Sequence, residues 1–103
     1  MTIEFMRLAL VEAARAIREG CAPYPGVGVI VEFQGLPIVR GHNGPPGQPH
    51  AEVRALDEAL TKGLDLRQCI LHTNLEPCPN QGGLVHACTL RIIESGIREV
   101  HVS

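Results

Sequence analysis

Residues 49–62 read PHAEVRALDEALTK and predict a helix that Gly63 ends. The apolar residues of this segment recur at steps of three and four and form one face: Val53, Leu56 and Leu60. The preceding loop, residues 41–49, is dense in glycine and proline, and loops of this kind often carry binding groups. His50 and Glu52 are therefore expected at a junction between a loop and a helix.

The rest of the chain alternates between predicted helices and strands. A first helix is expected over residues 3–17, between Thr2 as its N-cap and Gly20 as its C-cap. A third helix includes Leu90 and ends at Gly96. Four strands are expected, at residues 27–31, 36–39, 69–75 and 97–102. The order α-β-β-α-β-α-β predicts an α/β sandwich around one sheet, in a single domain over residues 1–103.

The composition excludes several classes of protein. Nine Lys and Arg against eleven Asp and Glu give a net charge of −2, and only 3% of the residues are aromatic. A basic surface for nucleic acid and a stacking platform for its bases are therefore not expected. No apolar run reaches the roughly 20 residues of a membrane span, and the first residues lack the pattern of a secretory signal. A cytoplasmic protein without a membrane partner is expected.

Three residues with soft donor atoms fall in the two predicted loop-to-helix segments: His50, Cys78 and Cys88. Cysteines of a cytoplasmic chain are thiols or metal ligands more often than disulfides. One imidazole and two thiolates suit Zn²⁺, and three protein ligands leave a fourth position for water. Zinc lowers the pKa of that water toward ~7, and Glu52, two residues after His50, is the expected proton carrier. No motif surrounds Cys21 or Cys69, which are expected in the core.

The motifs resemble the zinc-dependent cytidine deaminase superfamily, whose signature is H-x-E followed by P-C and a later Cys. Within it the chain most resembles the deaminase domain of the riboflavin-biosynthesis deaminase/reductase, over nearly its whole length. The stretches that carry this resemblance are residues 6–10, 27–31, 47–52, 75–78, 88–89 and 92–97. It implies a three-layer α/β/α sandwich of the cytidine deaminase type, short at its C-terminus, that holds zinc through His50, Cys78 and Cys88.

The resemblance also implies an activity, the hydrolytic deamination of an amino-substituted pyrimidine, purine or related heterocycle. Ammonia would leave after zinc-bound hydroxide attacks the ring, with Glu52 as the proton shuttle. Asn43 and Ala51 are implied as substrate contacts, and a turn-forming role beside Gly44 suits Asn43 equally well. Related deaminases are dimers or tetramers, so a homo-oligomer is expected.

Several alternatives stay open. Tyr24 and Asn80 replace residues that surround the substrate in the family, so the substrate is a riboflavin-pathway aminopyrimidine or a nucleoside or nucleotide. His86 competes with His50 as a zinc ligand, and Glu76 is expected to be a strand-end residue that hydrogen-bonds to the backbone. No role is expected for three further histidines: His42, His72 and His101. The alternative to an enzyme is a non-catalytic zinc-binding module with this fold. Glu52 favours the enzyme, because a structural zinc site has no use for a carboxylate beside an open position.

Overall fold

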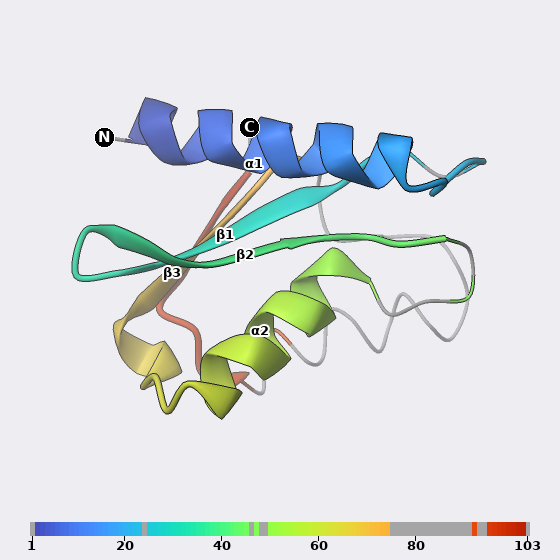
Figure 1. The fold of residues 1–103 in the computed structure, drawn as a ribbon. Coiled ribbons are helices and arrows are strands. Elements are labelled where there is room, and N and C mark those ends of the chain that lie inside the picture. Colours follow the sequence, from blue (N-terminus) through green and yellow to red (C-terminus); the bar gives the residue numbers. More distant parts are fainter. Residues whose placement is uncertain are drawn as a thin grey trace.

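A four-stranded sheet lies between two helices, with α1 on one face and α2 on the other (Figure 1). The computed structural model describes residues 2–23, 25–45, 47, 50–74, 92 and 95–102. The elements have these bounds: α1 Thr2–Arg18, β1 Gly28–Phe33, β2 Leu36–His42, α2 Ala51–Thr61, η1 Leu66–Gln68, β3 Cys69–Thr73 and β4 Glu99–Val102. This arrangement is the three-layer α/β/α sandwich that the sequence predicts.

The strands lie in the order β2-β1-β3-β4. β1 pairs antiparallel with β2 and with β3, whereas β3 and β4 are parallel. A two-residue turn joins β1 to β2, and both its residues have positive φ, Gln34 at 53° and Gly35 at 80°. This combination defines the tight hairpin turn whose twist matches that of the strands. Pro37, which has no backbone N–H to donate, lies in β2, at one edge of the described sheet.

β1 divides the core in two because its successive side chains point to opposite faces of the sheet. Val29 and Val31 belong to the larger cluster, which fills the space between the sheet and α2 and includes Leu56 of α2. Ile30 belongs to a smaller cluster under α1, together with Phe5. Full burial of a side chain such as Leu56 stabilises the fold by about 1.5–3 kcal/mol. The valine and isoleucine run of β1 thus fixes both helices on the sheet.

Two of the three predicted helix stops, Gly20 and Gly63, are confirmed. Gly20 follows α1 with a φ of 89°, which a residue with a side chain rarely adopts. Its N–H donates to the carbonyl of Ile17 at 3.2 Å, and the next N–H, of Cys21, donates to Ala16 at 3.2 Å. These bonds satisfy two carbonyls that the helix end leaves open. Gly63, with a φ of 79°, ends α2 through the same pair of bonds.

Some predicted boundaries are wrong. β2 extends to His42 rather than residue 39, because its pairing with β1 continues as far as Gly28. The loop predicted from Gly41 is shorter for the same reason. Thr2 lies within α1 instead of capping it, and α2 begins at Ala51, two residues later than predicted.

The predicted third helix falls largely outside the described residues, Leu90 included. Its predicted stop, Gly96, has a φ of 77°. Cys21 and Cys69 are buried free thiols, as predicted. Within the ranges that the structure covers, no helix combines the length and the apolarity needed to cross a membrane.

Candidate functional site

The described residues of the predicted site lie at one end of the sheet. β2 ends at His42 and β3 ends at Thr73, and both strand ends lie beside the start of β1 at Gly28. α2 begins near this end, because only residues 43–50 connect it to β2 (Figure 1). The start of α2 carries His50 and Glu52, and Asn43 directly follows β2.

Asn43 binds the backbone that leads into β1. Its side-chain Oδ1 accepts a hydrogen bond from the N–H of Val27 at 2.8 Å, and its Nδ2 donates to the carbonyl of Pro25 at 3.1 Å. Asn74, after β3, makes a matching pair of bonds of 2.8 and 3.2 Å to the same segment from the other side. The two amides hold residues 25–28 between the ends of β2 and β3. In the structure, both polar atoms of the Asn43 amide therefore hydrogen-bond to the backbone of this segment.

His50 is the N-cap residue of α2. Its backbone is extended, with φ −66° and ψ 156°, and its side chain does not cap the helix. Its carbonyl accepts the first helical hydrogen bond, from the N–H of Arg54 at 3.0 Å. The imidazole thus makes no capping bond to the N–H groups of its own helix.

Glu52 lies in the first turn of α2 and is only 2% exposed. Burial raises the pKa of its carboxyl, because removal from water disfavours the charged form. A hydrogen bond from its own backbone N–H and the charge of His50 both lower this pKa, with smaller effects. The carboxyl therefore holds a proton more readily than an exposed glutamate does, which suits a group that accepts and returns protons.

Ala51, between these two residues, is fully buried in the core cluster under α2. Its methyl group packs against apolar side chains. Any substrate contact at this position therefore involves its backbone N–H, one of the first four N–H groups of the helix, which have no partner within it.

The zinc site is only partly described. Of its three predicted ligands, His50 is described, whereas Cys78 and Cys88 lie outside the described residues, as do Glu76, Asn80 and His86. Among the residues that the structure describes, no three His, Cys, Asp or Glu side chains are grouped so as to hold a metal ion. An imidazole that does not cap its helix fits the nitrogen donor that zinc takes, so the described part of the site is compatible with the metal.

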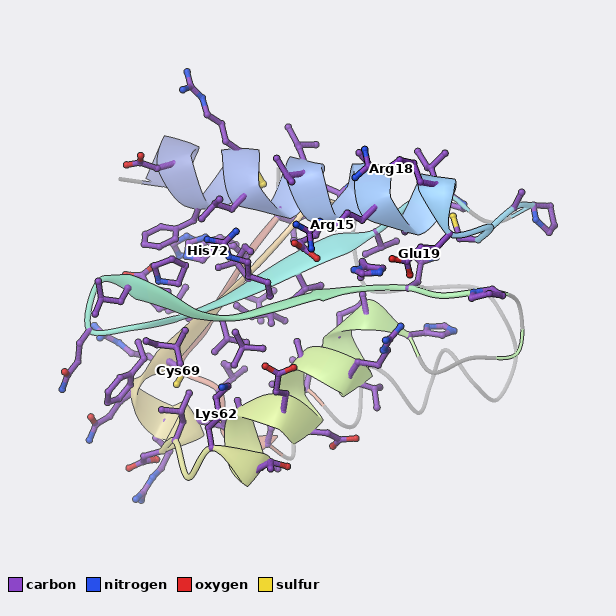
Figure 2. All side chains as sticks on the ribbon, viewed as in Figure 1. Arg15, Arg18, Glu19, Lys62, Cys69 and His72 are labelled. Atoms are coloured by element: carbon purple, nitrogen blue, oxygen red, sulfur yellow. The ribbon has the colours of Figure 1, made fainter. Side chains whose placement is uncertain are left out.

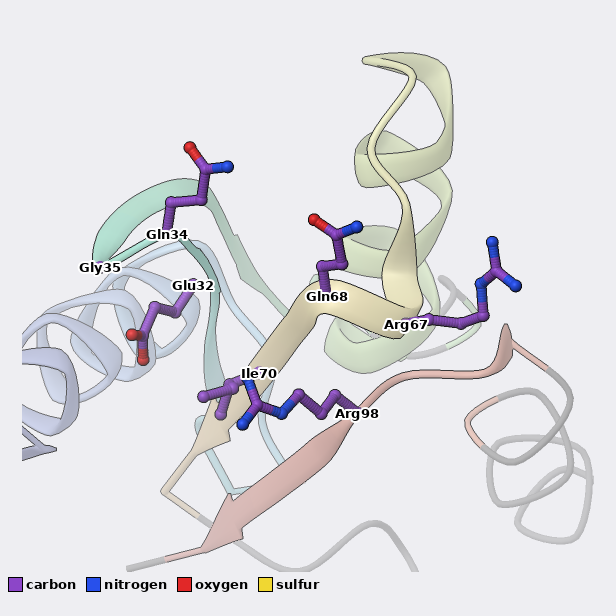
Figure 3. A pocket seen from close by; sticks show the side chains of 7 residues that line it. All are labelled: Glu32, Gln34, Gly35, Arg67, Gln68, Ile70 and Arg98. Carbon is purple, nitrogen blue, oxygen red and sulfur yellow. The ribbon is translucent and has the colours of Figure 1, made fainter.

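One hollow in the described structure lies away from this site. It has a volume of about 390 Å³ and lies beside the β1–β2 turn, where Gln34, Gln68 and Arg98 line it (Figure 3). It contains neither His50 nor Glu52. The Arg67 side chain on its rim is paired with Asp65, at 3.1 Å between Nε and Oδ1. Its position at the far end of β1 separates it from the predicted site.

Sequence reasoning missed a polar cluster beside the site. His42, for which no role was expected, binds Glu12 of α1 and Glu19, which directly follows that helix, through its two ring nitrogens. Arg54 of α2 donates to the carbonyl of His42. These contacts join residues 30, 23 and 12 positions apart, and no local sequence pattern marks them.

Comparisons with known proteins agree with this architecture. The family model for the cytidine and deoxycytidylate deaminase zinc-binding region matches residues 1–103, so the chain belongs to this family. The riboflavin biosynthesis protein RibD of Aquifex aeolicus is 39% identical over 100 residues, which are 96% of this chain and 26% of that protein. RibD of Synechocystis is 43% identical over 98 residues, 94% of this chain and 25% of the relative.

A solved structure extends the likeness to three dimensions. The crystal structure of a diaminohydroxyphosphoribosylaminopyrimidine deaminase/5-amino-6-(5-phosphoribosylamino)uracil reductase from Thermotoga maritima has a TM-score of 0.83 and 36% sequence identity. The match covers 98% of this chain and 28% of that one. The chain thus spans about a quarter of the length of these relatives and has the fold of their deaminase part.

Proposed function

We propose that this member of the cytidine and deoxycytidylate deaminase family is a zinc-dependent hydrolytic deaminase of an amino-substituted heterocycle. The observation that carries the proposal is Glu52, a buried carboxyl with a raised pKa in the first turn of α2, two residues after His50. An aminopyrimidine of the riboflavin pathway is the first candidate substrate, because relatives up to 43% identical are riboflavin biosynthesis proteins.

His50, Cys78 and Cys88 would hold the zinc. His50 presents its imidazole at the start of α2. In the sequence, Cys78 comes four residues after Asn74, the residue that follows β3. Ile92, four residues after Cys88, packs in the same core cluster as Leu56 of α2. When bound, zinc would make water available as a nucleophile near neutral pH.

Glu52 moves the protons of the reaction. Its carboxylate accepts a proton from the attacking water as the new C–O bond forms at the ring carbon that bears the amino group. The carboxyl then protonates the neighbouring ring nitrogen. It takes the proton of the new hydroxyl and delivers it to the amine, so that the C–N bond breaks and ammonia leaves. Burial supports this role, because it raises the pKa of the carboxyl and so makes the group easier to protonate than an exposed glutamate.

The backbone and neighbouring side chains would orient the substrate. The segment 25–28, held by Asn43 and Asn74, borders the start of α2 at the same end of the sheet. The backbone N–H of Ala51 is proposed as a direct contact to the heterocycle, and Asn43 as a residue that acts on it only through its hold on segment 25–28. The competing proposal, a zinc-binding module without turnover, leaves the buried carboxyl of Glu52 without a function.

The test is ammonia release by the purified, zinc-loaded chain. The panel contains diaminopyrimidine ribosides and their phosphates, cytidine, deoxycytidine phosphate, adenine and guanine. We expect turnover of at least one aminopyrimidine, loss of zinc and activity in His50→Ala, and unchanged activity in Arg40→Ala. A wild-type protein that carries one zinc per chain and releases no ammonia from any of these compounds supports the non-catalytic module instead.

A further inference from the structure

Arg54 fixes both ends of the connection between β2 and α2. Its backbone N–H donates to the carbonyl of His50 at 3.0 Å, where the helix begins. Its side-chain Nη1 donates to the carbonyl of His42 at 3.0 Å, where the strand ends. Residues 43–50 connect the strand to the helix. Arg54 therefore binds the carbonyl that precedes this connection, at His42, and the carbonyl of its last residue, His50. The side-chain bond to His42 joins α2 to β2 and limits how far the first turn of α2 can move relative to the sheet.

His42 is itself held on α1. Its Nδ1 lies 2.9 Å from Oε1 of Glu12, and its Nε2 lies 2.9 Å from Oε1 of Glu19. Both ring nitrogens of His42 are thus within hydrogen-bond distance of a carboxylate oxygen. The pKa of Glu19 is lowered, chiefly by its hydrogen bond to His42. Figure 2 shows Glu19 reaching from the end of α1 towards β2.

Three elements are thus joined in series: Glu12 of α1, with Glu19 just after that helix, then His42 of β2, and Arg54 of α2. Glu12 is only 2% exposed, and Nε of Arg15 approaches its second oxygen at 3.8 Å. Arg40 and Glu58 complete the lining of a 210 Å³ hollow around these residues. A buried acid is retained at a cost in solvation, which its ionic hydrogen bonds must offset.

We infer that Arg54 is a positioning residue for His50 and Glu52, with His42 as its anchor on the sheet. This inference rests on the proposed function. Arg54 touches neither substrate nor metal; it sets where the first turn of α2 lies. A displacement of about 1 Å in a catalytic group can reduce turnover about 100-fold, so one lost tether at this turn is measurable in the rate.

The experiment compares Arg54→Ala with Arg40→Ala, which removes an arginine from the rim of the same hollow. Among the described residues no hydrogen bond of the Arg40 side chain is recorded, which makes it a matched control for charge. Arg54→Lys, which keeps a donor able to reach the carbonyl of His42, serves as the rescue variant. Each protein is assayed for kcat, KM, melting temperature and zinc affinity by competition with a chelator.

We expect Arg54→Ala to lower kcat about 10-fold and to weaken zinc binding about 10-fold, with KM unchanged within a factor of two. Arg54→Lys should regain at least half of the lost kcat on a logarithmic scale, and Arg40→Ala should match the wild type. A role in stability alone would lower the melting temperature and leave kcat per zinc-loaded chain unchanged, which overturns the inference.

The zinc measurement separates this inference from the proposed function. If the wild type deaminates nothing but Arg54→Ala still weakens zinc binding relative to Arg40→Ala, Arg54 positions His50 and the proposed reaction is wrong. If the wild type deaminates and the two alanine variants agree in kcat and zinc affinity, the reaction stands and the positioning role is wrong. Should Arg54→Ala fail to fold, kcat and zinc affinity are compared between Arg54→Lys and Arg54→Gln instead. Only lysine retains a cationic donor, so the inference predicts the higher values for Arg54→Lys.

Discussion

Gly28 of β1 lies directly against the carbonyl oxygen of Ala9 in α1. A Cβ placed on Gly28 would overlap this oxygen and would come within 2.6 Å of the backbone nitrogen of Ala13. All of these atoms belong to the helix backbone and cannot move aside as a flexible side chain could. The absence of a side chain at Gly28 therefore sets how closely α1 approaches the sheet.

We accordingly expect Gly28→Ala to lower the free energy of unfolding by about 1–3 kcal/mol, the usual effect of overpacking. Gly41→Ala is the control, because its Cβ would meet Ala51 and Ala55 at 3.4 Å, an ordinary contact distance. Urea unfolding of both variants checks this. Equal stability of the two variants would contradict the close approach of α1 and β1.

Asn43→Ala removes the acceptor of the Val27 N–H and should lower the free energy of unfolding by about 1–3 kcal/mol. Asn74→Ala, which removes the matching acceptor of the Gly28 N–H, should have a similar effect. Because both amide atoms of Asn43 bind backbone, we expect the two variants to keep the wild-type KM per folded chain. A KM raised in Asn43→Ala alone would assign Asn43 to substrate binding.

The four cysteines should react in two pairs. Burial raises the pKa of the Cys69 thiol, and the charge of Asp65 adds to this, so little reactive thiolate forms at neutral pH. The Cys69 thiol loses its proton at a lower pH in the unfolded protein than in the folded protein. Cys69 therefore lowers the free energy of unfolding only as the pH rises above 9.0, the ordinary pKa of this thiol.

Thiol titration with a disulfide reagent at pH 7.5 checks the pairing. We expect no fast-reacting thiol in the zinc-loaded protein, two after treatment with a chelator, and four in denaturant. Cys21→Ser and Cys69→Ser should leave the two chelator-exposed thiols in place. Fast reaction of Cys69 in the folded protein would show that the core around β3 is more open than the structure indicates.

The sequence predicted the fold well where local chemistry decides it. The buried apolar run of β1, the stops at Gly20 and Gly63 and the hairpin turn at Gly35 all depend on residues close together in the chain. The end of β2 could not be predicted, because the strand extends to His42 only through its pairing with β1. The ionic contacts of His42 likewise join α1, β2 and α2 and have no local signature.

The candidate site likewise has a part that the sequence predicts and a part that depends on the fold. The motif around His50 and Glu52 could be read directly, and the structure adds that Glu52 is buried and that Ala51 packs into the core. A loop-based role for Asn43 could be anticipated, but its partners Pro25 and Val27 could not, since they are brought close only by the sheet.

Self-association is expected from the surface of the described residues. Leu10 and Ile17 of α1 are exposed, and so are Val100 and Val102 of β4, at the other edge of the described sheet. Association would remove such side chains from water. Light scattering should give a dimer or a tetramer at micromolar concentration, and a monomer under these conditions would refute the expected homo-oligomer.

The most direct test of the proposed deaminase is the rate of ammonia release by Glu52→Gln at equal zinc content. Glutamine keeps the shape of the side chain and cannot carry the proton. We predict that the variant binds one zinc per chain, as the wild type does, and turns over at least about 100-fold more slowly, the usual contribution of a positioned acid–base group. A zinc-loaded Glu52→Gln protein that deaminates at close to the wild-type rate would contradict the role of Glu52 and, with it, the proposed mechanism.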